Sequence, residues 1–237
     1  MFKEEIRERI WRILEEEGVA RFPRPVHGRI PNFEGAEIAG RRITELDEFK
    51  KAYVVKVSPD SPQYIIRLTC LKHGKTLIMP TPRLKEGFLL LDPSRIPEKY
   101  YDKAATIRGA FTFGEKIDPV KLPEIDFITV GSVAVGRDGS RIGKGEGYSE
   151  LEYAILREYG KIDEKVLVTT NVHDLQVLEN LPQDPFDVPV DIIATPSRLI
   201  RVTEKRPKPT GIIWSMLDDD KLREIPLLRS MKSRGRL

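Results

Sequence analysis

A glycine-rich stretch between an apolar run and a helical pattern constrains the fold of this chain more than any other feature. Residues 137–153 read RDGSRIGKGEGYSELEY, and the apolar run 127–135 before them has the length and β-branched content of a buried strand. After them, apolar side chains recur at helical spacing. A strand, a glycine loop and a helix in this order present backbone N–H groups to an anion. The stretch therefore predicts either an anion site or a tight turn without a ligand.

The composition of the loop favours the close approach of an anion. Gly143, Gly145 and Gly147 alternate, so the backbone can adopt a positive φ where a side chain would interfere. Arg141 and Lys144 add positive charge at the same place. The loop has neither the Gly-Lys-Ser/Thr end of a Walker A motif nor the G-x-G-x-x-G pattern of dinucleotide-binding folds. The motif is therefore unusual, and the rest of the chain must decide what it binds.

Strands and helices alternate along the chain, which predicts an α/β fold with a mostly parallel sheet covered on both faces. The expected strands are residues 53–57, 76–79, 88–91, 127–135, 166–170 and 192–195. The expected helices are residues 2–17, 44–52 with Thr44 as N-cap, 61–71 and 148–159. We expect residues 21–44 to be an irregular segment packed against the body, and residues 93–123 to be a proline-interrupted connection.

Composition indicates a reducing, aqueous location. The chain of 237 residues has one cysteine, which excludes an internal disulfide and any multi-cysteine metal site. Charged residues make up 32% of the chain, against three asparagines and three glutamines, a balance typical of thermophile proteins. No apolar stretch approaches the length of a membrane span, and the first residues do not read as a signal peptide. We therefore expect a cytoplasmic protein without a membrane partner.

Positive charge is concentrated towards the C-terminal end of the chain. Residues 201–237 hold ten Lys and Arg against five Asp and Glu. Such a tail could bind RNA or another anion, or could be a solvated surface. In the first predicted helix, Lys3 and Arg7 are four residues apart and share one face. This pair could hold a phosphate or form a solvated charged face, and the sequence leaves both alternatives open.

Two loops carry further candidate ligand-binding residues. Arg83 follows the strand 76–79 after Pro80, at the carboxyl end where open α/β sheets bind ligands. The loop that precedes the last predicted strand contains Asp184, Asp187 and Asp191, which are close enough in sequence to share a hard cation such as Mg²⁺. The alternative is that these aspartates only cap turns, an interpretation that suits Asp184 better than Asp191.

Four segments occur in an order that is familiar from one enzyme family. They are KEEIR at 3–7, IDFITVGSVAV at 125–135, GSRIGKGEGY at 139–148 and DVPVDIIAT at 187–195. Together they resemble the 5-formyltetrahydrofolate cyclo-ligase (methenyltetrahydrofolate synthetase) family, and the glycine motif is the most specific of the four. Residues 22–33 and 205–214 look like the branch called methenyltetrahydrofolate synthetase domain-containing proteins.

The resemblance implies a three-layer α/β/α sandwich of the kind shared with sugar-phosphate isomerases and CoA-transferases. It covers about residues 2–203, so we expect a cyclo-ligase-like domain over 1–203 and a basic extension, 204–237, packed on the same domain. The implied activity is ATP- and Mg²⁺-dependent closure of 5-formyltetrahydrofolate to 5,10-methenyltetrahydrofolate. ATP would phosphorylate the formyl oxygen, N10 would attack the activated carbon, and phosphate would leave. Such chemistry needs little from side chains beyond positioning and charge neutralisation.

The resemblance also implies roles for the residues at matching positions. The expected catalytic groups are Lys3, Arg7, Lys144 and Tyr148. The nucleotide would be held by Lys3, Arg7, Arg141, Gly143, Lys144, Gly145, Glu146, Gly147 and Tyr148. The folate side would be lined by Pro80 and Arg83, and the magnesium ion would be held by Glu150 and Asp191.

The chain departs from the family pattern at three places. Tyr148 is followed by Ser149 and Glu150, where the family has a second aromatic residue and an aspartate. Glu146 stands where the family has glycine or a basic residue, and a carboxylate beside phosphates is repulsive unless it is paired or metal-bound. No residue in 58–63 clearly matches the acidic residue that the family places against the folate after its first strand. The alternatives are therefore a ligase for another substrate and a non-catalytic member that binds nucleotide or RNA.

Overall fold

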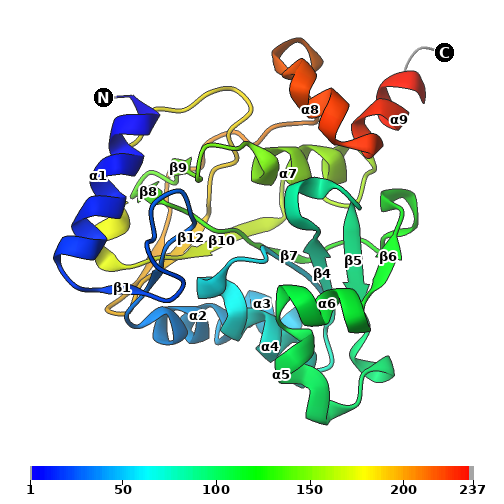
Figure 1. Ribbon diagram of the computed structural model, residues 1–237, viewed down its shortest axis with the longest axis horizontal. Helices are drawn as coiled ribbons and strands as arrows, with labels where there is room; N and C mark the ends of the chain where they lie inside the picture. The colour runs from blue at the N-terminus through cyan, green and yellow to red at the C-terminus, as the bar shows by residue number, and fades with distance from the viewer. Residues whose placement is uncertain (1, 235–237) are drawn as a thin grey trace.

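Within residues 2–234, which the computed structural model describes, an eight-stranded sheet forms the centre of the molecule (Figure 1). Its central strands are β3 (Val54–Val57), β4 (Thr76–Pro80), β7 (Phe127–Thr129), β10 (Leu167–Asn171) and β12 (Ile192–Ala194). They run parallel in the order β12-β10-β7-β3-β4. The antiparallel edge strands are β13 (Leu199–Arg201) beside β12, and β5 (Phe88–Leu91) and β6 (Glu115–Ile117) beyond β4.

Helices cover both faces of this sheet, and the predicted three-layer α/β/α architecture is confirmed (Figure 1). One face carries α2 (Ala36–Thr44), α3 (Asp47–Lys51), α4 (Tyr64–Lys72), α5 (Tyr101–Ala104) and α6 (Ile107–Phe113). The other carries α7 (Tyr148–Glu158), with α8 (Asp219–Glu224) and α9 (Pro226–Arg234). Alternate strand residues supply the two cores: Leu77 and Met79 face the first, and Ile78 the second. None of the described helices is both long and apolar enough to cross a membrane.

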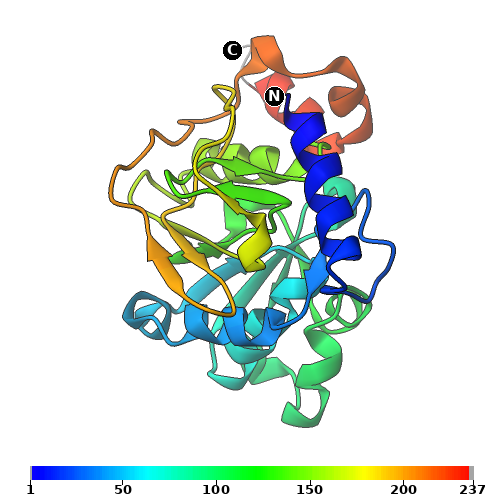
Figure 2. The same cartoon turned by 90° about the vertical axis from the view of Figure 1, so that its left-hand side faces the viewer.

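A smaller sheet carries the glycine loop at one side of the molecule. It consists of β8 (Ala134–Gly136), β9 (Arg141–Ile142) and β11 (Val177–Leu178), in the order β11-β8-β9. Helix α1 (Lys3–Glu16) packs against it through Ile10, Trp11 and Leu14, which share a core with Ile142. Figure 2 views this side, where α1 lies beside the short antiparallel pair β1 (Ala20–Arg21) and β2 (Asn32–Phe33). The N-terminal cations are thereby brought close to the loop.

The single strand predicted over residues 127–135 is wrong, because the chain changes sheets inside this run. β7 ends at Thr129, and β8 begins at Ala134 and pairs with β9 in the smaller sheet. Between them the Ser132 and Thr170 hydroxyls are hydrogen-bonded at 2.8 Å, and a Cβ on Gly131 would meet an Asp60 oxygen at 2.8 Å. Because the residues on both sides of the break are buried, the apolar pattern gave no sign of it.

The prediction for residues 21–52 is also partly wrong. Residues 36–44 form α2, and Thr44 is its last residue rather than the N-cap of the next helix. The Thr44 hydroxyl donates back to the carbonyl of Arg41 at 3.0 Å, which is a helix-interior contact. Gly40 allows α2 to lie against α4, since a Cβ at this position would be 2.2 Å from the Ile65 side chain. The prolines and glycines of the preceding loop concealed this helix, as those of residues 93–123 concealed α5, α6 and β6.

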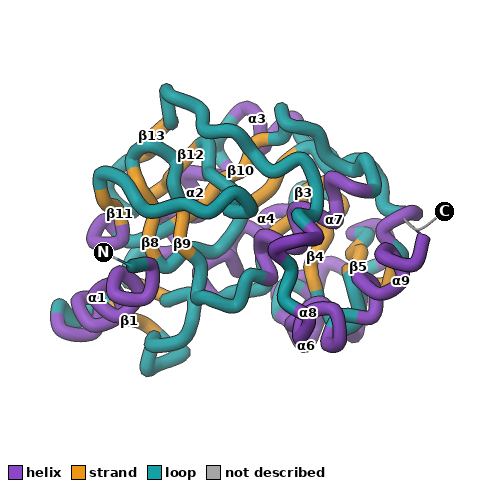
Figure 3. Tube along the Cα trace, turned by 90° about the horizontal axis from the view of Figure 1, so that it is seen from above, coloured by secondary structure: helices purple, strands orange, loops and turns teal. Residues whose placement is uncertain are grey.

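The C-terminal segment lies on the α7 face of the sheet. Ile212, Ile225 and Leu228 are buried in the core of that face. The ammonium group of Lys208 donates to the carbonyl of Val166 at 2.7 Å and pairs with Asp191 at 2.6 Å, and both charged side chains are buried. Seen from the side and from above, α8 and α9 lie over the end of the sheet formed by β4 and β5 (Figures 1 and 3).

The Lys208–Asp191 pair predicts a strong dependence of stability on one tail residue. Lys208→Met is expected to lower the free energy of unfolding by about 3 kcal/mol, because it leaves the Asp191 carboxylate buried without its counter-charge. Arg206→Met is the matched control, since Arg206 forms the more exposed tail-to-body pair with Asp138 and should contribute less than about 1 kcal/mol. Urea unfolding curves measure both. Equal losses would contradict the inference that the buried pair fastens the tail.

Candidate functional site

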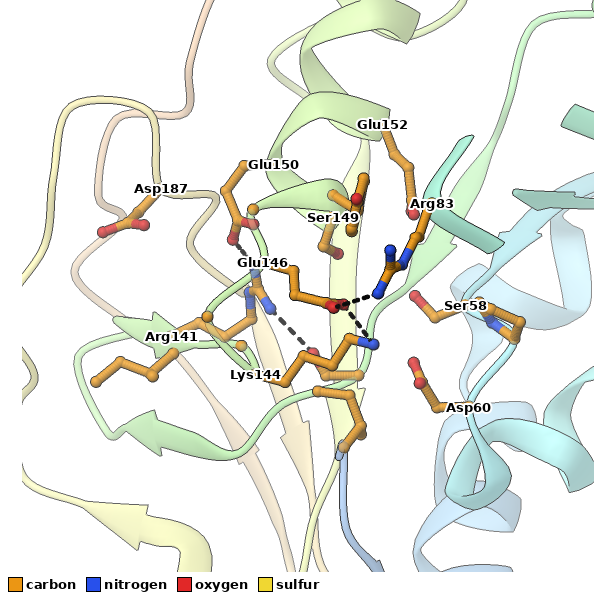
Figure 4. A pocket seen from close by; sticks show the side chains of 18 of the residues that line it. Ser58, Asp60, Arg83, Arg141, Lys144, Glu146, Ser149, Glu150, Glu152 and Asp187 are labelled. Carbon is orange, nitrogen blue, oxygen red and sulfur yellow. Dashed lines mark hydrogen bonds and ion pairs between the residues drawn. The ribbon is translucent and has the colours of Figure 1, made fainter. Parts of the chain in front are cut away.

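A cavity of about 490 Å³ lies where the carboxyl ends of β3, β4 and β7 meet the glycine loop (Figure 4). The segments that follow these strands line it with Asp60, Arg83 and Gly131, and the loop 143–147 lines it from the other side. The volume is within the range of small-molecule sites. The carboxyl ends of parallel strands are also the edge at which open α/β sheets bind ligands. The cavity is therefore the candidate functional site.

The glycine loop leads directly from β9 into α7 and leaves the helix N-terminus without a side-chain cap. Gly145 and Gly147 have φ angles of 103° and 71°, values that other residues rarely adopt. Arg7 supports the loop, because its Nε donates to the carbonyl of Gly143 at 2.8 Å. A Cβ on Gly145 would lie 3.3 Å from the Arg7 guanidinium carbon, so glycine also allows this contact. The loop thus presents backbone N–H groups at a helix start, as an anion site requires.

The cations around the cavity are each paired with carboxylates of the same chain. Lys3 pairs with Asp184 at 2.6 Å and with Asp187. Figure 4 shows the Glu146 carboxylate between two cations: Lys144 lies 2.6 Å from it and Arg83 3.7 Å. Asp187 is buried, but the other groups are partly exposed, so a ligand anion can compete for the cations.

Arg141 lines the cavity but is buried and fully engaged. Its guanidinium donates to the carbonyls of Gly131 at 2.9 Å and Val188 at 3.2 Å, and it forms an ion pair with Glu150. These contacts tie together the segment after β7, the segment before β12 and the first turn of α7. Arg141 therefore holds the walls of the cavity in place.

The sequence analysis did not select two carboxylates that line the cavity, Asp60 and Glu152, nor Lys56, which pairs with Glu152. Lys56 on β3 and Glu152 on α7 form a buried ion pair, and Glu152 lines the cavity. Burial raises the pKa of the Glu152 carboxyl, and Lys56 opposes this shift. Burial likewise raises the pKa of Asp60, against the nearby positive charges of Lys144, Arg67 and Lys56. Asp60 lies after the first central strand, within residues 58–63, where the sequence shows no clear match to the expected acidic residue.

A signal for these residues exists in the sequence. Lys56 interrupts an apolar strand, and Glu152 falls on the otherwise buried face of α7. A charged residue in such a position is expensive to bury unless it is paired. Asp60 directly precedes the Ser-Pro start of the next helix, at the carboxyl end of β3. The pairing itself joins residues 96 positions apart, and only the fold brings them together.

Most of the predicted site residues converge on this cavity. Those that line it are Lys3, Arg7, Arg83, Arg141, Gly143, Lys144, Gly145, Glu146, Gly147, Tyr148 and Glu150. Pro80 is buried at the end of β4 and does not line the cavity, whereas the next residues, Thr81 and Pro82, do.

The structure does not bring Asp191 to the cavity. Its carboxylate accepts from the backbone N–H of Val168 at 2.8 Å and from Lys208, at the amino end of the parallel strands. Asp187 lines the cavity instead, where burial raises the pKa of its carboxyl and Lys3 opposes the shift. Between Asp187 and Asp191 the chain runs from the cavity at the carboxyl ends of the strands to their amino ends. Sequence spacing alone could not tell which aspartate faces the site.

The Lys56–Glu152 pair makes a testable contribution to stability. Glu152→Gln is expected to lower the free energy of unfolding by about 3–5 kcal/mol, because it leaves a buried ammonium group without its counter-charge. The double variant Lys56→Met/Glu152→Leu should regain most of this loss, since matched apolar groups often replace a buried pair at little cost. Glu16→Gln breaks an exposed pair with Arg12 and serves as the control. Urea unfolding measures all three, and a double variant as unstable as the single one would contradict the expectation.

Comparison with known proteins points to one family. The sequence model of the 5-formyltetrahydrofolate cyclo-ligase family matches residues 2–196. The methenyltetrahydrofolate synthase domain-containing proteins of Homo sapiens and Mus musculus are 42% and 43% identical to this chain. These alignments cover 98% of this chain but 62% and 63% of the relatives, so the chain spans less than two thirds of their length.

A solved structure shares the fold. The NMR structure of Aquifex aeolicus 5,10-methenyltetrahydrofolate synthetase is similar with a TM-score of 0.54 and 24% sequence identity, over 87% of this chain and 95% of that one. The match of the family model and the identity to the two relatives confirm the resemblance seen in the sequence. The chain belongs to the 5-formyltetrahydrofolate cyclo-ligase family.

Proposed function

We propose that this chain catalyses the ATP- and Mg²⁺-dependent closure of 5-formyltetrahydrofolate to 5,10-methenyltetrahydrofolate through a phosphorylated formyl group. The observation that carries the proposal is the convergence of a glycine loop, a helix start and three cations from separate segments on one cavity. The three cations are Lys3, Arg7 and Lys144. Membership of the cyclo-ligase family supports the same reaction.

The glycine loop fits the phosphates of a nucleotide. Gly147 is the N-cap of α7 and offers no side chain, so the first N–H groups of the helix remain available to an anion. Lys144 projects from the same loop, and its partner Glu146 is partly exposed and therefore replaceable. Arg7 supports the conformation of the loop, because its Nε donates a hydrogen bond to the carbonyl of Gly143.

The charge of the cavity supports a requirement for a divalent cation. Five cationic and six carboxylate side chains are among the residues that line it, so a triphosphate would meet no net positive charge. Asp187 and Glu150 fit a hard cation, because burial and, to a smaller degree, the nearby charge of Glu150 raise the pKa of the Asp187 carboxyl, and a bound cation would relieve both effects. No cage of three acidic, histidine or cysteine side chains occurs within residues 2–234, which suits Mg²⁺, an ion that keeps waters and substrate phosphates as ligands. When bound, Mg²⁺ would neutralise charge on the transferred phosphoryl group.

The proposed reaction needs positioned groups rather than a protein nucleophile. The γ-phosphoryl group passes to the formyl oxygen, N10 attacks the formyl carbon, the N10 proton leaves, and the C–O bond to phosphate breaks. We assign Arg83 and the preceding residues to the folate side, opposite the glycine loop. Asp60, whose pKa is raised by burial, suits a hydrogen-bonding or proton-accepting role towards the pterin.

Binding of RNA through the basic tail has less support. Arg206 and Lys208 pair with carboxylates of the body, and Arg223 pairs with Asp220 within α8. These cations are therefore partly neutralised, and phosphate binding by them would have to replace existing pairs. We retain RNA binding only as the outcome to consider if the ligase assay fails.

The test is to incubate the purified chain with Mg-ATP and 5-formyltetrahydrofolate, both at ambient and at elevated temperature. We expect the near-ultraviolet absorbance of the methenyl product to appear together with ADP, and both to be lost when Mg²⁺ is chelated. ADP without methenyl product would point to a different acceptor. The absence of both products would overturn the proposed function.

Arg7 provides a test of the nucleotide site. Arg7→Ala is expected to weaken ATP binding by one to two orders of magnitude, the scale of a lost charge-assisted contact of about 1.5–3 kcal/mol. Arg12→Ala on the same helix is the control, because the Arg12 side chain is exposed and is not among the residues that line the cavity. Isothermal titration calorimetry measures both affinities. An unchanged affinity in Arg7→Ala would remove Arg7 from the nucleotide site.

A further inference from the structure

The C-terminal segment reaches the proposed active site, although it lies beyond the part of the chain that the family model matches. That match ends at residue 196, and α8 begins at Asp219. Two side chains of α8, Lys221 and Glu224, nevertheless contact residues that line the cavity. The family motif and the tail therefore meet in one cluster of side chains.

Tyr148, the tyrosine of the glycine motif, is held by both tail residues. Its hydroxyl donates to a carboxylate oxygen of Glu224 at 2.6 Å. The ammonium group of Lys221 lies 3.6 Å from the centre of the Tyr148 ring, within cation–π range. Burial, together with the hydrogen bond to Glu224, raises the pKa of the Tyr148 phenol. The tail thus fixes the direction of the hydroxyl.

The same carboxylate faces Arg83 on the opposite wall of the cavity. Arg83 lies 3.4 Å from Glu224 and 3.7 Å from Glu146, so its guanidinium is held between a tail residue and a loop residue. The backbone of Arg83 and Leu84 has φ angles of 56° and 52°, a strained conformation for residues other than glycine. Such strain persists where the surroundings fix the backbone, and Leu84 is fully buried. The loop thus aims Arg83 at the cavity, and Glu224 limits where its charge can lie.

The position of Glu224 does not depend on these two contacts. The next residue, Ile225, is fully buried, and so is Leu228 in α9. Further upstream, Lys208 fastens the tail through its buried pair with Asp191. Because apolar anchors and a separate ion pair hold the segment, Glu224 is placed at the site by its neighbours. Its carboxylate is therefore available for a role other than holding the tail.

We propose that Glu224 is a positioning residue of the site, which orients the Tyr148 hydroxyl and the Arg83 guanidinium towards the folate substrate. The proposal rests on the proposed ligase function for its substrate. In this proposal the tail is a part of the catalytic unit. The Glu224 carboxylate acts through Tyr148 and Arg83, which lie on facing walls of the cavity. Glu224→Ala removes both contacts, whereas Glu224→Gln keeps an acceptor for the tyrosine hydroxyl and removes the charge.

The first measurement needs neither ligand nor activity. The full chain is labelled with 3-fluorotyrosine, and the Tyr148 resonance is assigned with Tyr148→Phe. Glu224→Gln should shift the Tyr148 resonance, because the charged acceptor of its hydroxyl is gone. Glu204→Gln, which changes an exposed glutamate of the same tail, should leave the resonance unchanged.

The second measurement is kinetic. We expect Glu224→Ala to raise KM for 5-formyltetrahydrofolate about tenfold, and Glu224→Gln about threefold, with smaller changes in kcat and none in Glu204→Gln. Urea unfolding of the variants separates this effect from a loss of stability. An unchanged Tyr148 resonance in Glu224→Gln, or an unchanged KM in a folded Glu224→Ala, would overturn the proposal. If the unmodified chain makes no methenyl product, the ligase function fails, and the fluorine resonance still decides whether Glu224 holds the Tyr148 hydroxyl.

Discussion

The buried guanidinium of Arg141 is the interaction on which the site depends. It joins the Gly131 carbonyl after β7, the Val188 carbonyl before β12 and the Glu150 carboxylate in α7. Only arginine has enough donors in a planar fork to serve three such partners at once. Because a buried charge without partners is costly, these segments must come together for the chain to fold. The glycine loop begins two residues later, so its position follows from this contact.

The charges around the cavity fall into two groups that differ in burial. The Lys56–Glu152 and Arg141–Glu150 pairs are buried and belong to the permanent framework. The pairs that Glu146 makes with Lys144 and Arg83 are partly exposed, where ion pairs contribute little and exchange readily. A ligand phosphate can therefore replace Glu146 without disturbing the framework. This distinction explains how a glutamate in the glycine loop is compatible with an anion site.

The C-terminal segment extends the domain beyond the part that the family model matches. Its apolar residues Ile212, Ile225 and Leu228 join the core on the α7 face, so the segment and the sheet share one apolar interior. The basic composition of the tail is compatible with an RNA contact. In the structure, Lys208 and Lys221 contact the body through a carboxylate and an aromatic ring instead. The net charge of a segment thus does not reveal whether its cations face solvent or the rest of the chain.

The sequence by itself determined the α/β class, the glycine loop and the start of α7, because periodicity and turn chemistry are local properties. It also indicated the family, through motifs that are continuous in the chain. Only the tertiary structure decided that the run 127–135 divides between two sheets, that Asp187 rather than Asp191 faces the cavity, and that Glu224 reaches Tyr148. Each of these depends on contacts between residues far apart in the chain. Side-chain type and spacing do not predict such contacts, because the contacts form only when the sheet is assembled.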